Sequence, residues 1–77
     1  MEFKELDTVV LVRDLPKYGL RQGDLGAGVQ IYEPDAIEVE FVTAAGKTEA
    51  LVTLDIQYFR QVVDTDLIAV RSLNQTA

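Results

Sequence analysis

The sequence contains no cysteine and no histidine. The absence of cysteine excludes disulfides, thiolate metal sites and thiol nucleophiles, and it is compatible with a reducing compartment. The absence of histidine removes the one side chain that titrates near neutral pH without perturbation. Only carboxylates remain as candidate metal ligands. We therefore predict a protein that is not an enzyme, with no catalytic residues, no metal site and no cofactor.

Long apolar runs are also missing, and no segment approaches the length that a membrane-spanning helix needs. The first seven residues include acidic side chains and lack the apolar core of a signal peptide. These two absences predict a cytoplasmic protein that does not contact a membrane.

Positive charge is scarce, with seven Lys and Arg against 13 Asp and Glu, for a net charge of −6. Nucleic-acid binding requires clustered cations that displace phosphate counterions. Here the cations are scattered singly along the chain: Lys4, Arg13, Lys17, Arg21, Lys47, Arg60 and Arg71. We therefore predict no nucleic-acid binding.

Short apolar segments separated by turn residues dominate the 77-residue chain, and none has the period of an amphipathic helix. They predict five strands, over 8–13, 25–33, 37–41, 48–54 and 58–63. At this length a small barrel is the economical all-β fold, because closing a sheet hides its edges. We expect one barrel domain over 1–63 and a C-terminal extension over 64–77.

Several local patterns predict details of these strands. In 25–33 one face is expected to carry Leu25, Ala27, Val29 and Ile31, with the two glycines between them allowing strong coiling. Gly46 suits a positive φ in a tight hairpin, and Asp55 is placed to cap a single turn before the last strand.

The stretch from Asp14 to Gly28 is the most distinctive part of the sequence, because it contains four glycines and a proline. A phosphate-binding loop would end in Gly-Lys-Ser/Thr or lead into a helix, and this stretch enters a strand instead. We interpret its glycines as turn residues. The carboxylate pairs Glu33/Asp35 and Glu38/Glu40 are interpreted as turn and solvent-facing residues rather than as acid–base or calcium sites.

Aromatic residues suggest where a partner could bind. Phe3, Phe41 and Phe59 are expected in the core, whereas Tyr18 in the long loop and Tyr32 on a strand either form an exposed surface or cover the end of the barrel. The candidate partner-binding surface comprises Tyr18, Arg21, Tyr32, Glu38 and Glu40.

The final segment is the hardest to interpret, since 64–73 is compatible with a strand, a short helix or a docked extension. We expect Leu67, Ile68 and Val70 to pack, because three large apolar side chains are costly to leave in water. Docking on the same chain is favoured over docking on a second subunit, so both a monomer and a homodimer remain open. Residues 74–77 are expected to fray.

The order of motifs resembles a small bacterial family of unknown function that is common in cyanobacteria. The resemblance covers roughly 3–63 and is carried by Leu6–Leu11, Asp14-Leu15-Pro16, Gly19-Leu20, Gly23–Gly26, Tyr32-Glu33-Pro34, Glu38–Phe41 and Leu51–Leu54. It implies a five-stranded SH3-like barrel similar to KOW and nitrile-hydratase β-subunit domains, and it implies no catalytic residues. A bulkier residue than Gly28 is expected at that position of the family pattern.

These observations favour a non-catalytic module that binds another protein. Two alternatives are an antitoxin or immunity-type protein that masks a toxin from a neighbouring gene, and an RNA-binding barrel, which the negative charge disfavours. Proline-rich ligands are not favoured, because peptide-binding SH3 domains use a groove lined by tryptophan and this chain has none.

Overall fold

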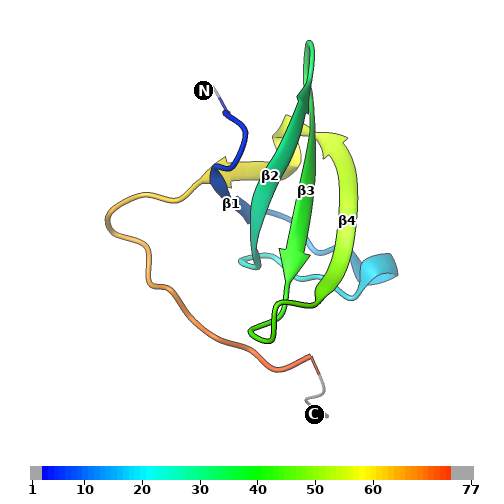
Figure 1. Cartoon of the computed structure of the whole chain (residues 1–77). Coiled ribbons are helices and arrows are strands. Elements are labelled where there is room, and N and C mark those ends of the chain that lie inside the picture. The colour runs from blue at the N-terminus through cyan, green and yellow to red at the C-terminus, as the bar shows by residue number, and fades with distance from the viewer. Residues whose placement is uncertain (1–2, 74–77) are drawn as a thin grey trace.

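The computed structural model describes residues 3–73 and contains five antiparallel strands in one sheet (Figure 1). The predicted all-β, five-stranded fold is therefore confirmed. Two single turns of 3₁₀ helix lie between strands, one after β1 and one before β5. The elements are β1 (Thr8–Leu11), η1 (Pro16–Tyr18), β2 (Leu25–Tyr32), β3 (Ala36–Val42), β4 (Thr48–Asp55), η2 (Ile56–Tyr58) and β5 (Phe59–Gln61).

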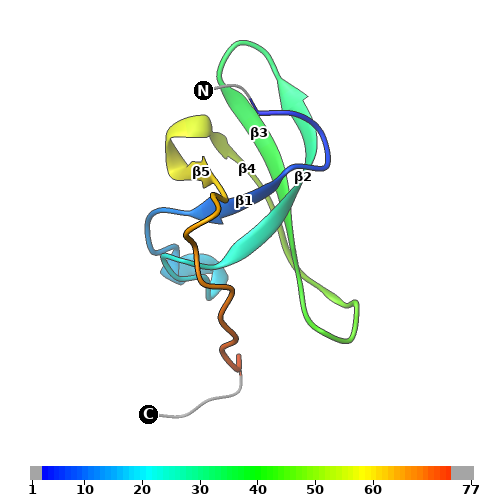
Figure 2. The same cartoon turned by 90° about the vertical axis from the view of Figure 1, so that its left-hand side faces the viewer.

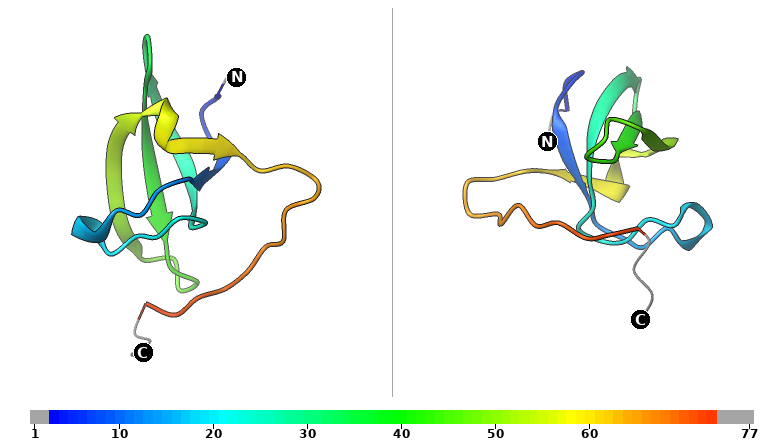
Figure 3. Two further views of the ribbon diagram at one scale, coloured as in Figure 1. Left: turned by 180° about the vertical axis from the view of Figure 1, so that it is seen from behind. Right: turned by 60° about the horizontal axis from the view of Figure 1, so that its bottom comes forward.

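The sheet curls without closing. Its strand order is β4-β3-β2-β1-β5, so β4 and β5 are its two edges. The long strand β2 belongs to both halves, because Ala27 pairs with Thr8 of β1 on one side and with Glu40 of β3 on the other. As a result β1 and β5 fold behind the β2–β3–β4 half, as the side and rear views show (Figures 2 and 3).

The core lies between these two halves. Val9, Leu11, Ile37 and Val39 are fully buried, and the rings of Phe41 and Phe59 pack with their centroids 6.5 Å apart. Every second residue of β3 faces inward, because neighbouring side chains of a strand point to opposite faces. The expectation that Phe41 and Phe59 are core residues is confirmed, and Phe3 packs half-buried against the same cluster.

The predicted face of β2 is wrong. Gly26 and Gly28 face the core, whereas Val29 is exposed. A β-bulge between Gly28 and Gln30 inserts Val29 as an extra residue and reverses the alternation, so that Ile31 again meets Ile37 on the inner face. A Cβ on Gly26 would lie 2.5 Å from Cγ1 of Val39 in the neighbouring strand β3, so the side chains of β3 leave no room for one on the inner face of β2 at this position.

The β3–β4 hairpin and the turn before β5 follow the sequence closely. Gly46 adopts φ +85°, as predicted for the hairpin turn. Asp55 Oδ1 accepts a hydrogen bond of 2.8 Å from the backbone N–H of Gln57, which confirms its capping role. The first and last strands are shorter than predicted and end at Leu11 and Gln61.

Candidate protein-interaction surface

The side of β2, β3 and β4 that faces away from the core forms an open surface, which we call the outer face. The strand register aligns its side chains in two cross-strand rows. One row is Gln30–Glu38–Thr53 and the other is Ala27–Glu40–Leu51. Tyr32 ends β2 above the first row. Among the described residues no segment crosses this face in Figures 1 and 2.

This half of the sheet is acidic. Strands β2, β3 and β4 contain four carboxylates, Glu38, Glu40, Glu49 and Asp55, and no Lys or Arg. Glu40 is oriented by the Thr48 hydroxyl, which donates a hydrogen bond to its carboxylate. Apolar area accompanies the charge, since Tyr32 is 41% exposed and Leu51 is 54% exposed. Such a face can contact a protein surface that offers cations around an apolar centre.

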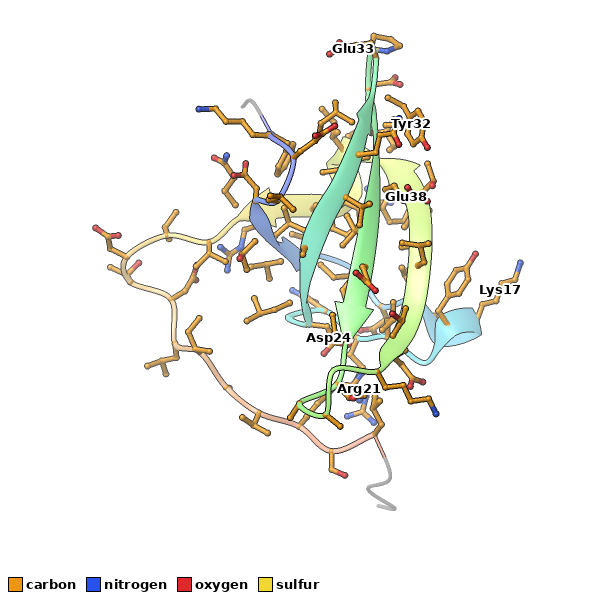
Figure 4. All side chains as sticks on the ribbon, in the orientation of Figure 1. Lys17, Arg21, Asp24, Tyr32, Glu33 and Glu38 are labelled. Atoms are coloured by element: carbon orange, nitrogen blue, oxygen red, sulfur yellow. The ribbon has the colours of Figure 1, made fainter. Side chains whose placement is uncertain are left out.

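The structure separates the five residues that the sequence suggested for partner binding. Tyr32, Glu38 and Glu40 share the outer face, whereas Tyr18 lies in η1 and Arg21 in the following loop. Figure 4 shows Tyr32 near the β2–β3 turn, and Lys17 and Arg21 toward the other end of the molecule. Tyr18 is also exposed, with Nζ of Lys17 5.8 Å from its ring centroid. The two tyrosines therefore belong to separate parts of the surface.

The long loop, residues 12–24, is held in place by hydrogen bonds within itself and to the end of β1. Asp14 Oδ1 accepts the backbone N–H of Gln22 at 2.9 Å, and Gly23 N–H donates to the Leu11 carbonyl at 2.7 Å. Leu15 and Leu20 form a two-bond antiparallel bridge across η1. This bridge directs Leu20 into the core, where it is buried. These contacts give the glycine-rich stretch a structural role, as the sequence indicated.

Asp24 joins the long loop to the C-terminal end of the described chain. Its Oδ2 accepts the Arg21 N–H at 2.8 Å, and both its oxygens accept hydrogen bonds from Arg71, at 2.8 and 2.7 Å. Partial burial raises the pKa of Asp24, but the bonds from Arg71 and from the Arg21 backbone outweigh it and the net pKa is lowered. Arg71 also donates to the Gly19 carbonyl at 3.0 Å, so one guanidinium fixes two points of the loop.

A second bidentate pair lies at the other end of the tail, residues 62–73. Arg60 Nη1 and Nη2 each donate to Asp66 at 2.9 Å, and the Val63 N–H donates to the same carboxylate at 2.7 Å. These donors, Arg60 first, hold the pKa of Asp66 at about 2, below its ordinary value of 3.8. The hydrogen bond to Asp66 in turn raises the pKa of Arg60.

Between the two ion pairs the apolar side chains of the tail are exposed. Leu67 is 94% exposed and Val70 is 97% exposed, and Ile68 is exposed as well. The prediction that these three residues pack on their own barrel is therefore wrong: ion pairs, rather than apolar contacts, hold the tail to the domain. The expectation for residues 74–77 lies outside the described residues.

A groove separates the tail from the β3–β4 hairpin. Its volume is about 690 Å³, and Leu20, Leu25, Phe41 and Val42 provide its apolar wall, with Val70 and Arg71 on the tail side. Its charged residues have both signs, Asp24 and Glu49 against Lys47 and Arg71. The groove therefore has no net preference for a cation or an anion.

Within residues 3–73, His, Cys, Asp and Glu form no group of three or more that could hold a metal ion. In the same range no helix is long and apolar enough to cross a membrane.

A family model matches residues 5–61, and its description is a domain of unknown function, DUF4926. The chain belongs to the DUF4926 family. No curated protein and no solved structure matches the chain. The DUF4926 match ends at β5, so the strands and the long loop lie within it and the tail lies beyond it.

The sequence interpretation missed two parts of the DUF4926 surface. Leu51 belongs to the outer face, and the alternation of Ala50, Val52 and Leu54 across β4 was a sufficient signal for it. The pairs Asp24–Arg71 and Arg60–Asp66 were also missed. For Asp24 and Arg71, which are 47 positions apart, no local spacing could have revealed the contact.

Proposed function

We propose that the domain is a non-catalytic module whose outer face binds a protein with a basic surface. The observation that carries this proposal is the composition of β2, β3 and β4, which have four carboxylates and no cation around the exposed Tyr32 and Leu51. Tyrosine is enriched in protein interfaces, where its ring packs and its hydroxyl remains hydrogen-bonded. Opposed charge on the partner would speed association and fix its orientation.

The position of the face also supports this function. Its residues project from three paired strands rather than from loops, so little conformational entropy is lost when a partner binds. Glu38 is in the central strand, between Gln30 and Thr53, which gives the charge a fixed place.

The test is capture of partners from the source cell with three tagged chains: wild type, the double variant Tyr32→Ala/Glu38→Lys, and the control Glu5→Lys. Glu5 is exposed and precedes β1, so the control reverses a charge away from the outer face. Thermal melting verifies that each chain folds. We expect the same protein with wild type and control, and its loss with the double variant. Identical recovery with all three chains, or no specific recovery with any, would overturn the proposal.

The second candidate is an antitoxin or immunity-type protein. The cation-free β2–β4 half favours it specifically, because a toxin that acts on nucleic acid has a basic site that such a face can mask. Expression of the neighbouring gene alone and together with this chain distinguishes the two. Toxicity that only the co-expressed chain relieves would support masking, and a harmless neighbour would exclude it.

We also propose that the open five-stranded sheet is an SH3-like barrel and that the domain acts in the bacterial cytoplasm. The strand order, with a long loop after β1 and a 3₁₀ turn before β5, supports the architecture. The absence of cysteine supports the location. Binding to RNA is not proposed, because Arg60 and Arg71 are both engaged by carboxylates.

A further inference from the structure

A short row of side chains, Leu25–Val10–Arg60, lies on the side of β1 that faces away from the core. Val9 and Leu11 are fully buried in the core, so Val10, between them, points to the opposite side. The strand register places Leu25 and Arg60 beside it, one on each neighbouring strand. Val10 is only 6% exposed, although it does not belong to the core cluster. It is therefore covered from outside the core.

The tail supplies this cover. Figure 2 shows it passing in front of the end of β1 and the start of β2. Residues 66–69 of the tail line one cavity of about 140 Å³ together with Val10, Leu25 and Arg60. Leu25 and Ala69 line both this cavity and the larger groove beside the β3–β4 hairpin. The tail thus forms the outer wall of both spaces, and it passes Leu25 where they meet.

Apolar contact does little to hold this cover in place. Leu67 and Val70 remain 94% and 97% exposed while the tail is attached. The backbone N–H groups of residues 67–70 donate no hydrogen bond within the described part of the chain. Detachment of this segment would therefore break few contacts apart from the ion pairs.

Of the two ion pairs, Asp24–Arg71 is the one that holds the far end of the tail. It joins positions 47 apart, and Arg71 also donates to the Gly19 carbonyl at 3.0 Å. Arg60–Asp66 joins positions only six apart, so it fixes the start of the tail without fixing its further path.

We propose that the tail is a detachable cover over Val10 and Leu25, which is closed by the Asp24–Arg71 pair and opens, with the domain still folded, when that pair is broken. Ion pairs near the surface are weak and are screened by salt, so the open and closed forms differ little in free energy. The cover controls access to the row Leu25–Val10–Arg60. The inference is independent of the proposed function, since it concerns the outward side of β1 and not the partner of the outer face.

Cysteine reactivity measures the opening, because the chain has no cysteine of its own. Val10→Cys places a thiol under the cover. Val9→Cys is the matched control, because its thiol lies in the core and reacts only when the domain unfolds. Each is combined with Arg71→Gln, which breaks the pair, and separately with Lys47→Gln, which removes the same charge from a groove residue that belongs to neither ion pair. N-ethylmaleimide is the reagent, since it is neutral and is not steered by the altered charge.

We expect Arg71→Gln to raise the modification rate of Val10→Cys by about tenfold or more and to leave that of Val9→Cys unchanged. Lys47→Gln should change neither rate. Raising the salt from about 0.05 M to about 1 M should also accelerate Val10→Cys, because it screens the pair, and should add little in the presence of Arg71→Gln. Leu25→Cys, which is half-buried in the same row, replaces Val10→Cys as the probe if thermal melting shows that the latter does not fold.

Three outcomes would overturn the proposal. An unchanged rate for Val10→Cys in Arg71→Gln would show that the row is covered without the far end of the tail. Equal acceleration of Val9→Cys would show that the tail holds the fold itself. Equal acceleration by Lys47→Gln would show that charge in general, and not the Asp24–Arg71 pair, controls access.

Discussion

The long loop, residues 12–24, and the tail, residues 62–73, are the two long irregular segments that the structure describes, and they are attached in different ways. The loop buries Leu20 and satisfies its backbone through Asp14, Asp24 and the Leu15–Leu20 bridge. The tail buries no large apolar side chain and is held by one bidentate Arg–Asp pair toward each end.

This difference shows that apolar content alone does not predict docking. The tail has six large aliphatic side chains and the loop has three, yet the tail leaves Leu67, Ile68 and Val70 exposed. The loop docks because its turns return the chain to the sheet with Leu20 facing inward. Between Asp66 and Ser72 the tail makes no turn that would direct these side chains toward the sheet, and the two Arg–Asp pairs attach it instead.

The largest expected effect comes from comparing buried and exposed leucines of the two segments. Leu20→Ala should lower the free energy of unfolding by about 2 to 5 kcal/mol, because it leaves a cavity in the core. Leu67→Ala should change it by less than about 0.5 kcal/mol. Urea denaturation of both variants measures the difference, and equal losses would contradict the comparison.

A smaller effect is expected from Asp24, which belongs to both attachments. Asp24→Ala removes the acceptor of the Arg21 N–H and of Arg71, and should cost about 1 to 3 kcal/mol. Arg71→Ala removes only the tail contact and should cost less than about 1 kcal/mol. The difference between the two variants in the same denaturation experiment isolates the role of Asp24 in the loop. A larger loss for Arg71→Ala would reverse this assignment.

Removal of the whole tail should cost little. A chain truncated after Val63 loses two ion pairs at the surface and no core contact, so its free energy of unfolding should fall by about 1 kcal/mol or less. Differential scanning calorimetry against the full chain measures this. Loss of cooperative unfolding in the truncated chain would show that the tail is part of the core.

The smallest effect is the pH response of the tail. The pKa of Asp66 is held at about 2 against an ordinary 3.8, so its carboxylate is stabilised in the folded state. The contribution of the ionised Asp66 to folded-state stability is therefore complete above the ordinary pKa, and it is lost as the pH falls through the folded-state pKa. We expect the Asp66 carboxyl carbon to titrate near pH 2 by NMR, with the Val63 amide following it. In Arg60→Gln the titration midpoint of Asp66 should rise toward the ordinary value. An unchanged midpoint would exclude the ion pair with Arg60 as the cause of the lowered pKa.

Much of the fold was predictable because β3 and β4 have a strict alternation of buried and exposed residues. Ile37, Val39 and Phe41 alternate with glutamates, and this pattern fixes both the strand and its inner face. The roles of Gly46 and Asp55 were also predictable, because each residue type satisfies a local backbone requirement.

Strand β2 and the tail were not readable in this way. The bulge at Val29 reverses the phase of β2, and a pattern of alternating residues does not reveal an inserted one. For the candidate site, the sequence supplied Tyr32, Glu38 and Glu40, but the separation of Tyr18 and Arg21 from them depends on the path of the long loop. The contact between Asp24 and Arg71 likewise depends on tertiary structure alone.

Amide hydrogen exchange of the full chain tests most directly whether the loop and the tail are held differently. In the loop, the N–H groups of Leu20 and Gly23 donate to backbone carbonyls, at 3.1 and 2.7 Å, and we expect strong protection. In the tail, the N–H groups of residues 67–70 have no hydrogen-bond partner within 3–73, and we expect exchange at nearly the rate of an unstructured peptide. Protection of residues 67–70 comparable to that of Leu20 would contradict the account.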